Sequence, residues 1–414
     1  MTPEIKQRIQ QIGRGEVPER YVKTALGLAP ANWKRYTFGD IYTERKESGD
    51  ENLPLLMVSI HSGVSDGEVD AAELPKQVKR IEDKSQYKKA VSGDLVFNMM
   101  RAWQGAIGTV RTTGMVSPAY IVAEPNDKVN PLFMDYYSRT PQMINQIDRR
   151  SYGVTDFRKR LYWDSFAPIG CILPPIEEQQ KIAAILTTQD KVIELKEKRL
   201  AEKQRQKKYL MQQLLTGKKR LPGFSGEWSF PKAKELFQSV SDKDHNGDLA
   251  VLSSTQDRGI VPRVEVDIDI KYDACSLVNY KKVSKGNFVI SLRSFQGGIE
   301  YSAYTGLVSP AYTVLSSRKE MSDGYYKQFF KSTDYINRLN VAVYGIRDGK
   351  QISYEDFGRL QIPCPPIKEQ DAIAEVLSTA DREIELLQQD IEQEKQKKKA
   401  LMQLLLTGIM RVKT

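Results

Sequence analysis

Pro174-Pro-Ile-Glu-Glu-Gln179 begins the stretch that decides the fold, and Leu214-Leu-Thr-Gly217 ends it. Both motifs return 191 residues later, as Pro365-Pro-Ile-Lys-Glu-Gln370 and Leu405-Leu-Thr-Gly408. Prolines followed by acidic residues are typical of a helix start, and a glycine after the last apolar residue is typical of a helix end. The sequence therefore predicts two long helices, over residues 174–217 and 365–410.

Both predicted helices carry an apolar stripe that repeats every seven residues, beside a second stripe of mixed character. This pattern is typical of a two-helix coiled coil. The first helix leads the chain into the second half, and the second helix can pack on it by the shortest connection if it runs back in the opposite direction. We therefore predict an antiparallel pair. Parallel pairing with a second molecule is the alternative. The expected interface residues are Leu186, Ile193, Leu200, Leu214, Leu377, Ile384, Ile391 and Leu405.

The segments between the helices repeat as well. Arg101-Ala-Trp-Gln-Gly-Ala-Ile107 returns 192 residues later as Arg293-Ser-Phe-Gln-Gly-Gly-Ile299, and Val-Ser-Pro-Ala-Tyr occurs in both halves. Short β-rich runs alternate there with turn residues and helical stretches, which is typical of an α+β domain. We expect two similar globular domains, at 31–173 and at 218–364 with its entry linker, separated by the long helices and related by an approximate twofold axis. Residues 1–30 form an N-terminal helical segment that is expected to pack near the end of the second long helix.

Composition excludes several classes of protein. The 414 residues carry a net charge of +9, and 40% of them are hydrophobic, as in a globular chain. No apolar run is long enough to span a membrane, and the polar start predicts a cytoplasmic protein. Three cysteines without a C-x-x-C and only two histidines argue against a disulfide framework or a metal site. Residues 191–220 and 395–414 together hold a net charge of +14, so the rest of the chain is slightly acidic.

The repeated Arg-x-aromatic-Gln-Gly loop is the first candidate for a binding site. Arginine can contact guanine and glutamine can contact adenine, each through two hydrogen bonds. Glycine allows a close approach of the backbone to a ligand. The alternative is that the loop is a turn that the fold itself requires. The candidate residues are Arg101, Gln104, Arg293 and Gln296.

A second candidate is the basic loop Tyr152-Gly-Val-Thr-Asp-Phe-Arg-Lys-Arg160, which has a counterpart at residues 344–351. Basic side chains on a polar loop suit contacts to phosphate, although a solvated basic loop is an equally simple interpretation. The candidate residues are Arg158, Lys159, Arg160, Arg347, Lys350 and Gln351. Neither loop resembles a catalytic motif: the chain has no GxxxxGK[ST], GxGxxG, HExxH or Asn-Pro-Pro-Tyr.

Two globular domains alternating with two long helices, each helix introduced by Pro-Pro-Ile-x-Glu-Gln and closed by Leu-Leu-Thr-Gly, resemble the specificity subunit of type I restriction–modification enzymes. The resemblance covers nearly the whole chain from about Trp33. The Arg-x-aromatic-Gln-Gly loops and the Val-Ser-Pro-Ala-Tyr runs also resemble those of target recognition domains in this family.

The resemblance implies that each domain reads one half of a bipartite DNA site and that the helices set the spacer. It further implies that the chain is not catalytic. Two methyltransferase subunits and two restriction subunits would be its partners, and these would use S-adenosylmethionine, ATP and Mg²⁺. A coiled-coil scaffold that joins proteins without reading DNA is the alternative function, and the sequence does not identify the bases.

Overall fold

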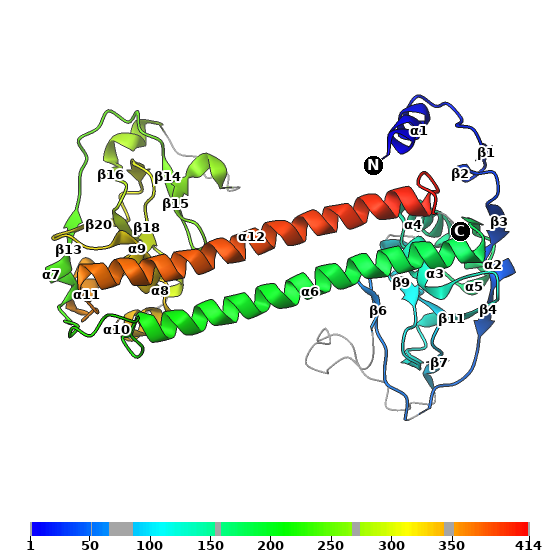
Figure 1. Ribbon diagram of the computed structural model, residues 1–414, viewed down its shortest axis with the longest axis horizontal. Coiled ribbons are helices and arrows are strands. Elements are labelled where there is room, and N and C mark those ends of the chain that lie inside the picture. The colour runs from blue at the N-terminus through cyan, green and yellow to red at the C-terminus, as the bar shows by residue number, and fades with distance from the viewer. Residues whose placement is uncertain are drawn as a thin grey trace. The chain divides into compact units, whose positions relative to one another are not determined.

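The computed structural model describes residues 2–50, 52–65, 86–153, 159–266, 274–342 and 352–412. Contacts divide the chain into unit 1, Met1–Leu195 with Ile391–Thr414, and unit 2, Lys196–Asp390. The boundaries fall inside the long helices α6 (Ile176–Leu214) and α12 (Ile367–Leu406), so each unit has a globular part and a portion of both helices (Figure 1). The two units are described separately below.

Unit 1 is built on a four-stranded antiparallel sheet. Its order is β4 (Tyr42–Arg45), β11 (Tyr120–Pro125), β8 (Leu95–Asn98) and β9 (Ile107–Thr109). Four strand pairs accompany it: β1 (Tyr21–Thr24) with β2 (Gly27–Pro30), β3 (Lys34–Thr37) with β12 (Gly170–Leu173), β5 (Val58–Ser59) with β6 (Gly63–Val64), and β7 (Lys88–Ala90) with β10 (Gly114–Val116). The shorter helices are α1 (Pro3–Gly13), α2 (Phe38–Ile41), α3 (Pro131–Tyr137), α4 (Pro141–Arg150) and α5 (Trp163–Phe166).

Unit 2 has the same sheet order. Strand β13 (Phe237–Val240) is followed by β20 (Thr313–Ser317), β17 (Phe288–Ile290) and β18 (Glu300–Tyr301). Two strand pairs accompany it: β14 (Leu252–Thr255) with β15 (Gly259–Pro262), and β16 (Lys281–Val283) with β19 (Gly306–Val308). Its shorter helices are α7 (Ala233–Leu236), α8 (Ser294–Gly297), α9 (Asp323–Phe329), α10 (Thr333–Ala342) and α11 (Tyr354–Arg359). The sequence repeat therefore corresponds to a repeated α+β fold.

Each unit has one main core, which the ends of the long helices complete. In unit 1, Phe97 and Phe166 pack with Leu186 of α6 and Leu405 of α12. In unit 2, a group of aromatic rings around Phe237 packs in the cluster that also holds Leu214 of α6 and Leu377 of α12. Burying large apolar side chains is the main source of stability, so each globular part is fixed to the helix segments of its own unit.

The long helices run antiparallel within each unit, as the sequence predicts. In unit 1, Gln189 of α6 donates to Glu394 of α12 at 2.7 Å, and Asp190 pairs with Lys398 at 2.5 Å. In unit 2, Lys196 pairs with Asp390 at 2.8 Å and Lys203 with Glu383 at 2.6 Å. Of the predicted stripe, Leu186, Ile193, Leu214, Leu377, Ile391 and Leu405 are buried, and Leu200 and Ile384 are half-buried.

The glutamate of the Pro-Pro-Ile-x-Glu-Gln motif forms a cluster with an arginine and a tryptophan. In unit 1, Arg411 donates two hydrogen bonds of 2.7 Å to Glu178, and the Trp33 indole donates a third of 3.2 Å. The Arg411 guanidinium also lies over the Trp33 ring, 6.0 Å from its centre. Glu178 is only 1% exposed, so these three bonds replace its lost hydration.

Unit 2 repeats this Glu–Arg–Trp cluster with corresponding residues. Arg220 donates to both carboxylate oxygens of Glu369, at 2.5 and 2.6 Å, and Trp228 donates at 2.9 Å. The neighbouring Gly217 has a φ of +70°, and a Cβ there would lie 3.2 Å from the Trp228 ring. The Thr-Gly motif therefore both ends α6 and leaves room for the tryptophan.

The glutamine that follows joins the helix start to the globular part. Gln179 accepts from the Asn130 amide at 2.8 Å, immediately before α3, and donates to the Lys128 carbonyl at 3.0 Å. Gln370 accepts from the Ser322 amide at 2.9 Å, immediately before α9. The motif thus fixes the start of each long helix to the corresponding short helix.

The N-terminal segment packs where the sequence predicts. Arg8 on α1 donates to the Ile409 carbonyl at 2.7 Å, just beyond the end of α12. The Tyr21 hydroxyl donates to the Gly408 carbonyl at 2.6 Å, and burial raises the pKa of Tyr21. The two ends of the chain are therefore linked within unit 1. Among the described residues, no helix is long and apolar enough to cross a membrane.

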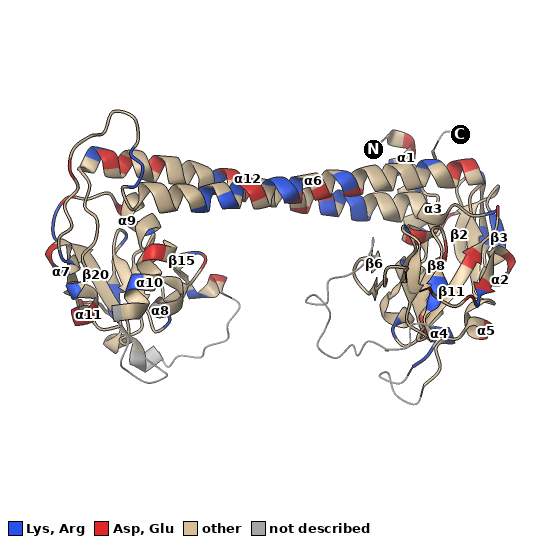
Figure 2. Ribbon diagram, turned by 90° about the horizontal axis from the view of Figure 1, so that it is seen from below, with Lys and Arg blue, Asp and Glu red and all other residues tan. Residues whose placement is uncertain are grey.

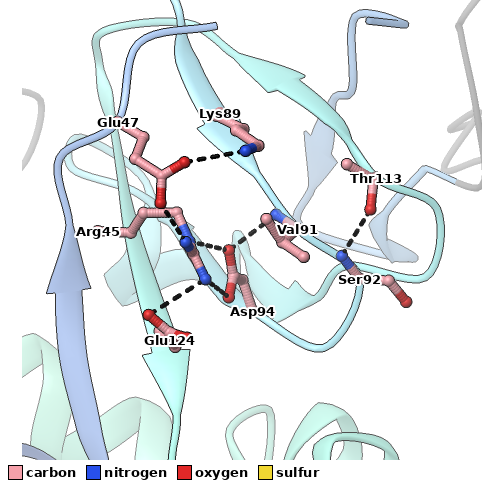
Figure 3. Close-up of polar contacts among 8 residues, drawn as sticks. All are labelled: Arg45, Glu47, Lys89, Val91, Ser92, Asp94, Thr113 and Glu124. Carbon is pink, nitrogen blue, oxygen red and sulfur yellow. Dashed lines mark hydrogen bonds and ion pairs between the residues drawn. The ribbon is translucent and has the colours of Figure 1, made fainter.

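An ion network crosses the unit 1 sheet (Figure 3). Arg45 of β4 donates to Asp94 at 2.7 Å and lies 3.2 Å from Glu124 of β11, and Glu47 joins Arg45 to Lys89. Asp94 also accepts from the Val91 amide, which fixes the turn before β8. Burial raises the pKa of Asp94, and Arg45 opposes that shift. The network thus anchors the strand that leads into the Arg101 loop.

In unit 2 the corresponding positions are neutral. Strand register places Val240 where Arg45 stands, Asn287 in place of Asp94, and Ser316 in place of Glu124. The Asn287 side chain accepts from the Ser284 amide at 2.8 Å, so the turn survives without the charges. The repeated fold therefore requires the turn and not the ion network.

Replacing Arg411 by methionine should destabilise the end of α12, because it leaves the buried Glu178 carboxylate without its cation. We expect the opening free energy of the last turns of α12 to fall by about 2–4 kcal/mol. This loss is smaller than that of breaking a fully buried ion pair, because Arg411 is partly exposed. Native-state hydrogen exchange measures this quantity. Arg382→Met, at an exposed position of the same helix, is the control.

The double variant Glu178→Gln with Arg411→Met should recover more than half of the loss, because it removes the unpaired charge as well. Equal destabilisation in the single and double variants would contradict this account of the cluster.

Candidate nucleic-acid interface

The first candidate loop leaves β8, and its Arg-x-Trp-Gln-Gly motif has buried and exposed members. Ala102 and Gly105 are buried, and the Trp103 indole donates to the Met100 carbonyl at 3.0 Å. Arg101 and Gln104 are exposed, and neither side chain has a hydrogen-bond or ion-pair partner within the described residues. The fold accounts for the buried members of the motif and leaves the arginine and the glutamine free for a ligand.

The corresponding loop in unit 2 has the same organisation. It leaves β17 and forms α8, with Ser294 buried and accepting from the Ser291 amide at 2.8 Å. Gly298 has a φ of +81°, and a Cβ there would collide with the Phe330 carbonyl. Arg293 and Gln296 are exposed. The two repeated loops therefore present the same pair of functional groups, one in each unit.

The second candidate loop lies against the first in unit 1. Tyr152 and Arg160 pair through backbone hydrogen bonds of 2.7 and 2.9 Å, which close the loop. The Leu161 amide donates to the Met99 carbonyl at 2.8 Å, and Lys159 lies 5.2 Å from the centre of the Trp103 ring. Residues predicted independently from sequence thus come together at one end of β8.

Lys159 and Arg160 differ in their surroundings. The Lys159 ammonium pairs with Asp148 at 2.8 Å and is largely covered, whereas Arg160 is exposed. Arg160 therefore suits a phosphate contact better than Lys159 does. The other predicted residues of the basic loops, Arg158, Arg347, Lys350 and Gln351, lie outside the described residues.

Sequence reasoning missed two further basic residues. Arg149 and Arg150 are exposed on the last turn of α4, the helix that packs on the loop segment Ala102–Gln104. Tyr152, immediately after them, is 63% exposed. The adjacent arginines directly before the predicted basic loop were the available signal.

A lysine holds the unit 2 loop in place. Lys331 pairs with the buried Glu300 of β18 and donates to the Gly297 carbonyl at 2.9 Å and to the Gln256 carbonyl at 3.1 Å. Burial raises the pKa of Glu300 to about 6, against the lowering effect of Lys331.

Unit 1 replaces this pair by another. Strand register places Gly108 where Glu300 stands, and the acid lies instead on α3 as Asp135. Asp135 accepts from Arg139 at 3.2 Å and from the Thr109 amide at 3.0 Å. In both units a buried acid and a base link the edge strand to the segment around the neighbouring helix. The acid lies on the strand in unit 2 and on the helix in unit 1.

The basic excess of the helices is partly neutralised. Figure 2 shows Lys and Arg interspersed with Asp and Glu along α6 and α12. The cations paired with carboxylates of the other helix or its start are Lys196, Lys203, Lys207, Arg220, Lys398 and Arg411. Composition therefore overstates the positive charge that the helices offer to DNA.

The described residues contain no group of three His, Cys, Asp or Glu side chains that could hold a metal ion. His61 is exposed at a hairpin tip, and His245 contacts the Tyr280 carbonyl at 2.9 Å. The site therefore consists of exposed hydrogen-bond donors and acceptors on loops.

Comparison with known proteins identifies the class. Residues 61–205 and 208–396 match the model of the type I restriction modification DNA specificity domain. The chain belongs to this family, and it is a DNA sequence-specificity subunit. The match to a DNA specificity domain overturns the alternative of a scaffold without DNA recognition. Members of this family are generally not catalytic.

Two curated relatives come from Methanocaldococcus jannaschii. A protein named as the MjaX type I restriction enzyme specificity subunit is 26% identical, over 96% of this chain and 98% of the relative. The MjaVIII type I restriction enzyme specificity subunit is 24% identical, over 80% of this chain and 83% of the relative.

Solved structures share the fold. A chain from a structure titled for complex assembly and conformational transition of the type I R-M system aligns with a TM-score of 0.54 and 18% identity, over 92% of this chain and 99% of that one. The S subunit of the M. genitalium type I restriction-modification system aligns with a TM-score of 0.53 and 11% identity, over 92% and 97%. The mixed α/β fold with two paired long helices is therefore that of known S subunits.

Changing Glu300 to glutamine should remove a pH dependence from unit 2. The folded-state pKa of about 6 lies above the usual 4.5, so the folded state binds more protons between these values. Stability of unit 2 should therefore fall by about 2 kcal/mol in total as the pH rises from about one unit below 4.5 to about one unit above 6. Hydrogen exchange of β18 amides across this range measures the slope.

Glu355→Gln is the matched control, because Glu355 is 82% exposed on α11 of the same unit. The slope should persist in this control and flatten in Glu300→Gln. A slope that survives in Glu300→Gln would show that another group causes it.

Proposed function

We propose that each unit reads one half of a bipartite DNA site through the exposed arginine and glutamine of its repeated loop. The observation that carries this proposal is that Arg101 with Gln104, and Arg293 with Gln296, are exposed beside buried residues of the same loops. Arginine and glutamine suit bidentate contacts to guanine and adenine in the major groove. Arg149, Arg150 and Arg160 supply phosphate contacts next to the unit 1 loop.

We further propose that the paired helices set the spacer between the half-sites and dock two methyltransferase subunits, with two restriction subunits completing the complex. Those subunits use S-adenosylmethionine, ATP and Mg²⁺, and the methylated base is adenine. The chain itself supplies recognition and no catalytic group. Its compartment is the cytoplasm, where such a complex meets DNA.

Arg101→Ala should relax specificity in one half-site only, by about 1–3 kcal/mol, because one bidentate base contact is lost. Arg293→Ala should act on the other half-site. Methylome sequencing of cells that carry the chain with its methyltransferase partner measures both effects. Lys319→Ala, an exposed unit 2 residue away from the loop, is the control.

The same experiment tests the proposed function. Absence of any bipartite methylated motif, or a motif that persists after deletion of this chain, would contradict it. Equal loss at both half-sites in Arg101→Ala would indicate a folding defect.

Duplicating residues 197–203 in α6 together with residues 384–390 in α12 should lengthen the spacer by about three base pairs. One heptad adds about 10 Å to a helix and returns the stripe to nearly the same face. The paired duplication also keeps Lys196 and Lys203 able to meet acidic partners. The methylated motif reports the spacer directly.

The duplication of residues 197–203 alone is the control, because it shifts the two helices out of register and should abolish methylation. Changed half-site sequences in the paired duplication would show that the helices do more than set the spacer.

A further inference from the structure

A short hairpin adjoins the candidate loop in each unit. In unit 1 it consists of β5 and β6, and in unit 2 of β14 and β15. Strand register aligns Ser59 and Gly63 with Thr255 and Gly259, so each hairpin has a tip of three residues. We define the tips as residues 60–62 in unit 1, Ile-His-Ser, and residues 256–258 in unit 2, Gln-Asp-Arg.

Both tips have the same backbone construction. The Ser59 hydroxyl accepts from the Ser62 amide at 3.4 Å, and the Thr255 hydroxyl accepts from the Arg258 amide at 3.2 Å. Gly63 has a φ of +76° and Gly259 one of +78°, values that favour glycine. The hydroxyl and the glycine hold each turn. In unit 1, Ile60 also packs on the buried cluster that includes Val58 and Val64, whereas His61 and Ser62 are exposed.

Each tip packs directly on the candidate loop. A Cβ at Gly105 would lie 3.2 Å from the Ile60 carbonyl, and a Cβ at Gly297 would lie 2.9 Å from the Gln256 side chain. In unit 2, Lys331 donates to carbonyls of both the tip and the loop. A side chain at the glycine of the Gln-Gly motif would meet the tip in each unit, so tip and loop form one surface.

The loops are alike in the two units, but the tips are not. A surface made only of the repeated arginine and glutamine would offer the same groups to both half-sites. The tips add an isoleucine, a histidine and a serine in unit 1, and a glutamine, an aspartate and an arginine in unit 2. Glutamine suits adenine, aspartate suits the amino group of cytosine, arginine suits guanine, and an apolar group suits the thymine methyl.

We propose that the hairpin tips contact bases and supply the contacts that make the two half-sites different. This inference rests on the proposed function, in which each unit reads one half-site. All three unit 2 tip residues are exposed, as are His61 and Ser62 in unit 1. Arg258 is 48% exposed and donates one bond to the Glu265 carbonyl at 3.1 Å, which leaves further donors on its guanidinium.

Arg258→Ala tests the unit 2 tip in the complex of the full chain with its methyltransferase subunits. Selectivity at one base pair of a single half-site should fall on the order of 5- to 150-fold, the value of one bidentate contact. Competition binding with DNA carrying every single substitution in the site measures this selectivity. Lys285→Ala is the control, since Lys285 is exposed at the opposite end of β17 from α8 and should leave selectivity unchanged.

Exchange of the tips provides the positive test. The exchange uses only exposed tip positions, because Ile60 packs on the buried cluster of its hairpin. The variant with His61→Asp and Ser62→Arg should change one or two base pairs of the unit 1 half-site, and leave the unit 2 half-site and the spacer as they were. The reverse exchange, Asp257→His and Arg258→Ser, should change the other half-site. Both variants keep the hydroxyl and the glycine that hold the turn.

The outcomes separate this inference from the proposed function. A wild-type complex without a bipartite motif contradicts the function itself. A wild-type motif that stays the same in Arg258→Ala and in both exchanges overturns the role of the tips alone. Equal loss of selectivity at both half-sites also overturns it, because a base contact acts on its own half-site.

Discussion

The buried carboxylates of Glu178 and Glu369 are the constraint on which the rest of the structure depends. A buried charge is costly unless it is paired and hydrogen-bonded, and each glutamate meets this requirement with an arginine and a tryptophan. In unit 1, Trp33, Glu178 and Arg411 come from the start, the middle and the end of the chain. One cluster therefore fixes the start of α6, the exit of α12 and the first strands of the globular part at once.

The sequence predicted the long helices because their boundaries and stripes are local patterns, and Glu178 and Glu369 belong to the motifs that begin them. The tryptophan and arginine partners lie outside these motifs. The hairpin tips escaped prediction for a physical reason. The loops and helices recur at offsets of 191 or 192, whereas the hairpins correspond at 196, and their strands are too short to show a periodic pattern. Only the shared strand register, a product of long-range pairing, reveals that residues 60–62 and 256–258 are equivalent. The surroundings of Lys159 were unpredictable for the same reason, since Trp103 lies far away in sequence.

The two units show which interactions the fold needs and which it can exchange. The turn before β8 is held by Asp94 with Arg45, and its equivalent by Asn287 without a charge. The edge strand is joined to the adjacent helix by Asp135 in one unit and by Glu300 in the other. Each buried acid is paired with a base in its own unit, and both units keep the same sheet order. The repeated fold is therefore compatible with different electrostatics close to each candidate loop.

The positions of the charged residues also suggest which parts of the chain favour DNA affinity and which favour specificity. The basic excess of the chain lies on α6, α12 and their exits, yet several of those cations pair with carboxylates of the partner helix. A paired lysine attracts phosphate less than a free one, because the neighbouring carboxylate repels the same phosphate. The globular parts, by contrast, carry little net charge but present exposed groups that suit base edges. The proposed contribution of this chain to base recognition therefore lies in the loops and in the hairpin tips that lie against them.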